Sequence, residues 1–162
     1  MGDSASQFEK PIVFKKGKVI FVEGEPSAFL YVIVSGEIMI FKEGKGPIIP
    51  ISLLGEKEFI GELSMFSDDP RNASAIAIED SELLMIKRTD IRKVIKTCPE
   101  WVNNILMLIS DRLRNTSKLL KEHRIVDEFN PASKKEFSTQ ELNQFQKSIK
   151  EYRERRGLKL SE

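Results

Sequence analysis

Cysteine and histidine are almost absent from this sequence. It contains one cysteine, Cys98, and one histidine, His123. A single cysteine cannot close an internal disulfide, and this favours a reducing, cytoplasmic setting. A metal-dependent enzyme of the cupin type needs several histidine ligands, and neither residue has a recognisable nucleophile or base partner. The sequence therefore predicts no catalytic residue and no metal site.

Long apolar runs and a dominant charge sign are absent as well. No uninterrupted apolar stretch approaches the roughly 20 residues that cross a bilayer, so no membrane partner is expected. The 26 basic and 25 acidic residues leave a formal net charge of +1, so overall charge gives no argument for nucleic-acid binding. With 162 residues, 40% of them hydrophobic, the chain can bury a core. We expect one domain with an appendage.

The first half of the chain alternates short β-branched or aromatic runs with turn residues. The predicted strands are residues 18–22, 30–34, 37–41, 48–53, 73–78 and 82–86. Their regular spacing, with glycine between them, is typical of antiparallel sheets that close on each other. The sequence thus predicts an α+β fold, in which an antiparallel β-roll (jelly roll) precedes C-terminal helices.

Helical periodicity begins near residue 88. We expect a helix at 89–97 and a long helix at 99–124, with Pro99 in a favourable first position. A heptad-like seam of alternating four- and three-residue separations follows the long helix, at Val102, Leu106, Ile109, Leu113, Thr116 and Leu120. We expect this seam to form a homodimer, while Ile105, Leu108 and Leu119 pack on the roll. The alternative is that the seam itself packs on the roll.

The end of the chain has its own helix signal. A helix-breaking segment containing Pro131 precedes Ser138-Thr139-Gln140-Glu141, which has the form of a capping box. The helix predicted at 138–156 places Leu142, Phe145, Ile149 and Tyr152 on one side, and this side needs a surface to cover. The predicted organisation is a flexible leader at 1–10, a domain at 11–124, and a linker with an amphipathic tail helix at 125–162.

Residues 59–75 hold the side chains with the most specific chemistry. Gly61 opens a segment suited to one helical turn, whose free N–H groups favour an anion. Arg71 offers a permanently charged planar fork that suits phosphate oxygens. Glu62 would repel a phosphate but could bind a sugar hydroxyl, and the small Ala73 leaves room for a ligand. Taken singly, Glu62 and Arg71 could instead be a surface ion pair.

Together, these residues resemble the phosphate-binding cassette of the cyclic nucleotide-binding domain family. That family has the pattern Phe-Gly-Glu-Leu-small, several variable residues, then Pro-Arg-small-small, and the resemblance extends over roughly residues 12–123. Two departures are Ile60, which lies between Phe59 and Gly61, and Asn72, which follows the arginine. The resemblance implies a cyclic nucleotide ligand held by Gly61, Glu62, Leu63, Ser64, Arg71, Asn72 and Ala73.

The long helix extends the resemblance to the base of the nucleotide. Residues 112–117 resemble a stretch from which catabolite activator-like proteins contact adenine through a Thr-Ser pair, here Thr116 and Ser117, with the serine supplied by the partner subunit. Arg112 matches an arginine near the phosphate end of that pocket. Carried over, this implies cAMP as the ligand, cGMP being less favoured, and a homodimer through the 99–124 helix that completes the pocket. The alternative is that Thr116 and Ser117 are ordinary polar positions of the helix.

The output of such a receptor is not defined by the sequence. Transcription factors of the family continue into a helix-turn-helix, whereas the 38 residues after the long helix contain no second helix of the recognition type. We therefore expect no DNA-binding domain in this chain. Two possibilities stay open: the sensor fragment of a larger regulator, or a receptor that signals to an unidentified protein partner through its C-terminal helices. A dimeric scaffold with a degenerate pocket is the rival function.

Overall fold

The structure is a computed structural model that describes residues 10–44, 46–66, 68–123 and 135–159. Most of the predicted leader lies outside the described residues, as do the last residue of the predicted domain, 124, and the segment 125–134 of the predicted linker. The described strands are β1 (Ile12–Phe14), β2 (Val19–Phe21), β3 (Phe29–Ser35), β4 (Ile38–Lys42), β5 (Ile49–Leu54), β6 (Phe59–Ile60), β7 (Ser74–Ala77) and β8 (Ser81–Lys87). The described helices are the 3-10 helix η2 (Glu62–Ser64) and the α-helices α1 (Arg88–Lys96), α2 (Glu100–His123) and α4 (Thr139–Arg156).

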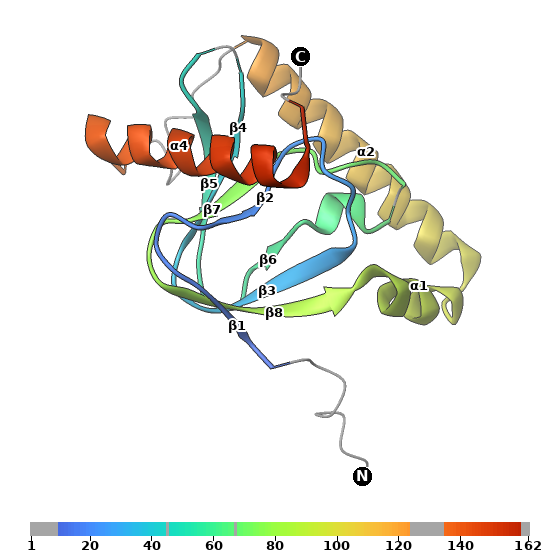
Figure 1. Ribbon diagram of the computed structural model, residues 1–162. Coiled ribbons are helices and arrows are strands. Elements are labelled where there is room, and N and C mark those ends of the chain that lie inside the picture. Colours follow the sequence, from blue (N-terminus) through green and yellow to red (C-terminus); the bar gives the residue numbers. More distant parts are fainter. Residues whose placement is uncertain (1–9, 45, 67, 124–134, 160–162) are drawn as a thin grey trace.

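The strands form two antiparallel sheets that face each other, as the predicted β-roll requires (Figure 1). The first sheet has the order β1-β8-β3-β6 and the second has the order β2-β7-β4-β5. Each of the six predicted strands is present, with its ends shifted by one residue. The additional strands β1 and β6 are only three and two residues long, too short for a periodic pattern to indicate them.

The second sheet is buried on both of its faces. Its inward side chains, such as Ile38 and Ala75, join residues of the first sheet in the core of the roll. Its outward side chains include Met39 and Ile76, which pair across β4 and β7 and are fully buried. These outward residues form a second apolar cluster with residues from α4. The sheet therefore has one face for the roll and one for a helix.

The helix that covers the outer face of this sheet is α4. As predicted, Ser138 and Glu141 form a complete capping box at its start, and the αL residue Gly157 ends it. Phe145, Ile149 and Tyr152 are buried against the sheet, and each apolar side chain buried in this way contributes about 1.5–3 kcal/mol. The surface that the tail helix covers is thus the outer face of β2, β4 and β7.

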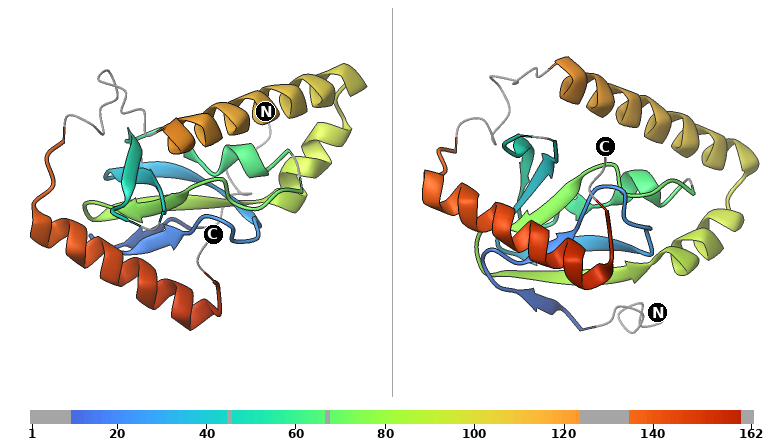
Figure 2. Two further views of the ribbon diagram at one scale, coloured as in Figure 1. Left: turned by 90° about the horizontal axis from the view of Figure 1, so that it is seen from above. Right: turned by 45° about the horizontal axis from the view of Figure 1, so that its top comes forward.

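The long helix α2 lies on the opposite side of the roll from α4 (Figure 2). Its roll-facing side chains follow an i, i+4 series, in which Val102, Leu106 and Arg114 are partly buried and Ser110 is buried. The prediction that another stripe packs on the roll is wrong, since Ile105, Leu108 and Leu119 are 46%, 51% and 52% exposed. The helix crosses the polar backbone around η2, and this favours polar side chains at the contact.

The predicted heptad seam is split between the two sides of α2. Val102 and Leu106 are partly buried, whereas Ile109 and Leu113 are 48% and 49% exposed. Trp101 is also exposed, so a broad apolar surface of the helix is left uncovered in a single chain. Among the described residues, no helix combines the length and apolar character needed to cross a membrane.

Candidate functional site

A glycine with a left-handed backbone marks the start of the predicted phosphate cassette. Strand β6 ends at Ile60, Gly61 has a φ of 85°, and the single 3-10 turn Glu62–Ser64 follows. A Cβ atom at position 61 would lie 2.0 Å from Nη1 of Arg71. Glycine is therefore required here both by the backbone angle and by the close approach of the arginine. The predicted helical turn is confirmed.

Arg71 is buried in the roll beside this turn, with only 4% of its surface exposed. Its Nη2 donates to the carbonyl oxygen of Phe29 at 2.5 Å, and its Nη1 donates to that of Gly61 at 3.2 Å. The guanidinium lies over the ring of Phe21, 4.1 Å from the ring centre. Because Arg71 is buried, the alternative of a surface ion pair with Glu62 is wrong.

The electrostatic state of Arg71 is unusual. Burial lowers its pKa, although the charges of Tyr31 and Glu25 act in the opposite direction, and an arginine in a protein stays protonated. Within the described part of the chain, no carboxylate forms an ion pair with it, and its buried Nε atom has no hydrogen-bond partner. A buried cation normally has an anionic partner. The site therefore fits an anion that the described residues do not supply.

A cavity of about 250 Å³ opens beside Arg71. Seven of the ten predicted ligand residues line it, namely Gly61, Glu62, Leu63, Ser64, Arg71, Asn72 and Ala73. The rest of the lining is largely apolar and comes from Phe21 and from β4, β5 and β6, including Ile40, Ile51 and Leu54. A concave apolar site with a few converging polar groups is the usual form of a small-molecule site.

The other cassette side chains have defined positions. Ser64 is buried, and its hydroxyl contacts that of Ser27 at 2.9 Å and donates to the Gly61 carbonyl oxygen at 3.2 Å. Glu62 is exposed at the rim, where it can reach a ligand without being desolvated. The main-chain oxygen of Asn72 accepts a hydrogen bond from the Lys42 ammonium group. The cassette is thus fixed by buried polar contacts at both of its ends.

The three candidates on α2 are not among the residues that line the cavity. Arg112 and Thr116 are exposed, and the Thr116 hydroxyl donates to the Arg112 carbonyl oxygen at 3.0 Å. The side chain of Ser117 lies outside the described part of the structure. The assignment of Thr116 and Ser117 to the adenine, and of Arg112 to the phosphate end of the pocket, stays a prediction.

Arg114 is a residue that the sequence reasoning missed. Its Nη2 donates to the Leu63 carbonyl oxygen at 3.1 Å, its Nη1 donates to the Pro70 carbonyl oxygen at 3.3 Å, and it forms an ion pair with Asp69 at 3.5 Å. These contacts bracket the cassette from α2. The signal for it was present, because residue 114 continues the i, i+4 series that begins at Val102 and faces the roll.

Metal chemistry has no visible basis in the described residues. They contain no group of three or more His, Cys, Asp or Glu side chains that could hold a metal ion.

Known proteins resemble this chain over more than half of its length. The family described as "Cyclic nucleotide-binding domain" matches residues 11–98. The "Cyclic AMP receptor protein" of Thermus thermophilus is 34% identical over 113 residues, which are 69% of this chain and 52% of that protein. This chain spans about half the length of the curated relatives it matches.

Solved structures give the same result for the fold. The Catabolite Activator Protein of Thermus thermophilus superposes with a TM-score of 0.57 at 33% identity, covering 74% of this chain and 56% of that one. The cAMP-bound form of the EAL enzyme Bd1971 gives a TM-score of 0.64 at 26% identity, covering 71% of this chain and 31% of that one. The cGMP-bound form of the same enzyme gives 0.63 at 26% identity, covering 70% and 30%. The predicted fold and the predicted family resemblance are both confirmed.

Proposed function

This chain belongs to the cyclic nucleotide-binding domain family, and on that premise we propose that it is a non-enzymatic cyclic nucleotide receptor whose ligand is cAMP. The single observation that carries the proposal is the state of Arg71, buried without a carboxylate partner among the described residues and with an unbonded Nε. The phosphate of a cyclic nucleotide supplies the missing negative charge and accepts hydrogen bonds from the planar fork.

Different residues of the cavity are assigned to the phosphate, the sugar and the base of the nucleotide. The phosphate lies between the η2 turn and Arg71, and Glu62 at the rim accepts a hydrogen bond from the ribose 2′-hydroxyl. Ala73 leaves space beside the phosphate, and the apolar lining from β4 and β5 faces the sugar and base. Asn72 and the α2 residues Thr116 and Ser117 complete the site at the base, and Arg112 of the same helix serves the phosphate end.

The preference for cAMP rests on Thr116 and Ser117 and on the relatives. The Thermus relative is a cyclic AMP receptor by name, whereas the similar EAL enzyme has been solved with cAMP and with cGMP. A titration with both nucleotides is therefore the informative measurement. Tight binding of cGMP alone would contradict the assignment of the ligand but not that of the site.

A homodimer through α2 is part of the proposal. Trp101, Ile105 and Leu108 are all exposed on this one helix, and a contiguous exposed apolar surface typically marks an interaction site. Pairing two copies along α2 covers this surface and brings Ser117 of one copy towards the pocket of the other. The predicted cytoplasmic setting and an unidentified protein partner for the signal belong to the same proposal.

Arg114 provides a route for the signal from the pocket to this interface. It contacts the carbonyl oxygens of Leu63 and Pro70, which lie on either side of the cassette, so a change in the cassette on binding requires α2 to follow. Ligand binding then shifts the population of α2 positions by its differential affinity for them. This coupling is what would make the domain a regulator.

Calorimetric titration of the chain with cAMP and cGMP tests the proposal. Wild-type protein is expected to bind cAMP, and Arg71→Ala is expected to weaken binding about 100-fold, because about two charge-assisted hydrogen bonds are lost. The matched control is Arg92→Ala, which removes the same charge from an exposed arginine that pairs with Asp68 outside the pocket. If folded wild-type protein binds neither nucleotide, also in a direct binding assay, the pocket is degenerate and the scaffold function is supported instead.

A further inference from the structure

The turn Glu23-Gly24-Glu25 holds the main chain of Arg71. The N–H of Gly24 donates to the Arg71 carbonyl oxygen at 2.9 Å, and the N–H of Arg71 donates to the Glu25 carbonyl oxygen at 2.9 Å. These two bonds fix the backbone from which the buried guanidinium extends. The position of the turn therefore sets the position of Arg71, the residue proposed to bind the phosphate.

Three side chains of the helix α4 contact the same Glu23-Gly24-Glu25 turn. The Tyr152 hydroxyl donates to the Glu25 carboxylate at 3.1 Å, and Nη1 of Arg156 donates to the same carboxylate at 2.8 Å. Nη2 of Arg153 donates to the Glu23 carbonyl oxygen at 2.9 Å. Burial and the nearby charge of Glu25 raise the pKa of Tyr152, so its hydroxyl keeps the proton that it donates.

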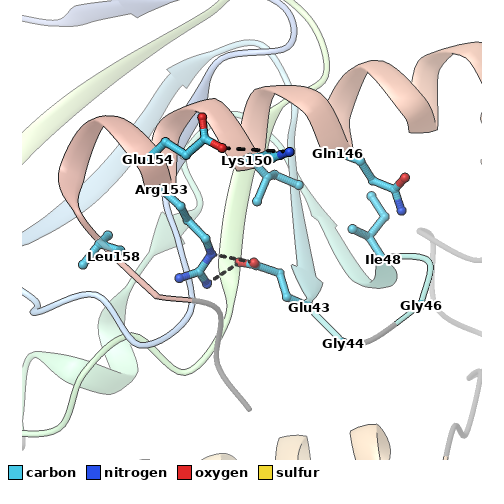
Figure 3. A pocket seen from close by; sticks show the side chains of 10 residues that line it. Glu43, Gly44, Gly46, Ile48, Gln146, Lys150, Arg153, Glu154 and Leu158 are labelled. Carbon is cyan, nitrogen blue, oxygen red and sulfur yellow. Dashed lines mark hydrogen bonds and ion pairs between the residues drawn. The ribbon is translucent and has the colours of Figure 1, made fainter.

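A second path runs from α4 through the end of β4. Nε and Nη2 of Arg153 contact the two carboxylate oxygens of Glu43 at 2.8 and 2.9 Å, in a buried bidentate pair (Figure 3). The neighbouring Lys42 pairs with the Glu23 carboxylate at 3.0 Å and donates to the main-chain oxygen of Asn72. Arg71 is thus connected to Tyr152 of α4 through Glu25. Asn72 is connected to Arg153 of α4 through Lys42 and Glu23.

We propose that α4 positions the nucleotide site, and that its docking on the roll and the binding of the nucleotide favour each other. The inference rests on the proposed function for the identity of the ligand. The helix α4 lies beyond residues 11–98, which match the family. The inference therefore concerns how this chain adds a control element to the pocket formed by the family domain. Tyr152, Arg153 and Arg156 are positioning residues in this scheme, because they act on the ligand only through the turn and β4.

Linkage gives the proposal two sides that can be measured independently. If docked α4 increases the affinity for the nucleotide by some factor, the bound nucleotide stabilises the docking of α4 by the same factor. Coupling between two sites typically amounts to about 5- to 150-fold in affinity. A helix with a purely structural role would add to the free energy of unfolding. It would change neither the affinity for the nucleotide nor the effect of the nucleotide on the docking of α4.

The first experiment measures the Kd for cAMP in the full chain carrying Tyr152→Phe together with Arg156→Gln. These changes keep the packing of the helix but remove its bonds to Glu25. The matched control is Phe145→Leu, which weakens the apolar contact of the same helix without touching the turn. We expect the Kd to rise about 5- to 100-fold in the first protein and to be unchanged in the second, both measured where circular dichroism shows complete folding.

The second experiment measures amide hydrogen exchange in residues 139–156 with and without cAMP. Exchange is expected to slow with the nucleotide in the wild-type protein and to be unaffected in Arg71→Ala. If wild-type protein binds cAMP but the two Kd values agree and exchange in α4 is unchanged, α4 is only structural and the inference is overturned while the proposed function stands. If wild-type protein binds no cyclic nucleotide, the proposed function fails and the inference falls with it.

Discussion

Two buried arginines lie on opposite sides of the β2-β7-β4-β5 sheet, and they differ in one respect. Arg153, on the outer side, has a bidentate carboxylate partner in Glu43. Arg71, on the pocket side, contacts main-chain oxygens, the Ser64 hydroxyl and two aromatic rings, but no carboxylate among the described residues. Both are 4% exposed. Among the described residues, one buried charge is compensated by a carboxylate and the other is not.

The presence or absence of a carboxylate partner changes what each buried arginine contributes to folding. A paired buried ion is costly to break, because removal of one partner leaves the other uncompensated. An arginine without an anionic partner is itself a cost of folding, and a site that keeps one stores binding energy for an anion. Both arginines line a cavity, but only at Arg153 does a carboxylate of the described residues, that of Glu43, pair with the guanidinium.

The largest expected effect is on stability without nucleotide, and it distinguishes the two arginines directly. Arg153→Met should lower the free energy of unfolding by about 3–5 kcal/mol, because Glu43 is left buried and unpaired. Arg71→Met should change it by less than about 1 kcal/mol or raise it, because no carboxylate loses a partner. Urea unfolding of both proteins provides the measurement. Equal losses would contradict the comparison.

A smaller effect is expected from the glycine that contacts Arg71. Gly61→Ala should cost about 1–3 kcal/mol from the left-handed backbone and should also weaken cAMP binding, because the new Cβ displaces the guanidinium. Gly17→Ala is the control, since Gly17 has a φ of 81° with no neighbouring atom within 4 Å. Thermal unfolding and calorimetry should show strain in both proteins but a loss of affinity only in Gly61→Ala. A similar loss of affinity in both would exclude displacement as the cause.

The smallest expected effect concerns the start of α4 and appears only in acid. Hydrogen bonds from Lys16 and Ser138 lower the pKa of Glu141 from 4.5 to about 2. A carboxylate whose pKa is lower in the folded state stabilises that state above pH 4.5, and the contribution is lost as the pH falls from 4.5 towards 2. Glu141→Gln should therefore lose stability relative to wild type at neutral pH, with the difference shrinking through this window in pH-dependent urea unfolding. A constant difference would contradict the role of the charge.

Much of the fold could be predicted from local patterns. Glycine-separated strands, the capping box at Ser138 and the apolar side of α4 are signals carried by neighbouring residues, and the structure confirms them. The cassette was likewise identifiable, since its seven residues lie together in the chain and around one cavity. Such features depend on spacing within a single segment.

The remaining features depend on contacts between distant segments. The sequence did not indicate that α4 would cover the outer face of the roll, because β4 and β7 are buried on both sides and so lack the apolar-polar alternation of a half-exposed strand. The pairing of Glu43 with Arg153 joins residues 110 positions apart, and no local pattern marks either partner. The side of α2 that faces the roll was also predicted wrongly. Its contact with the cassette is polar, so the apolar pattern of the helix does not mark it.

The position of α4 late in the chain affects how this protein folds during synthesis. Its contacts are strongly non-local, as the bond between Tyr152 and Glu25 spans 127 positions, and such contacts form slowly. At ordinary rates of translation, roughly 3–14 s pass between synthesis of the end of β8 and that of the end of α4. For that interval the outer side chains of the sheet, Met39, Phe41 and Ile76, have no cover. The nascent roll is therefore a candidate for chaperone binding, and ribosome stalling before residue 139 would prolong its exposure.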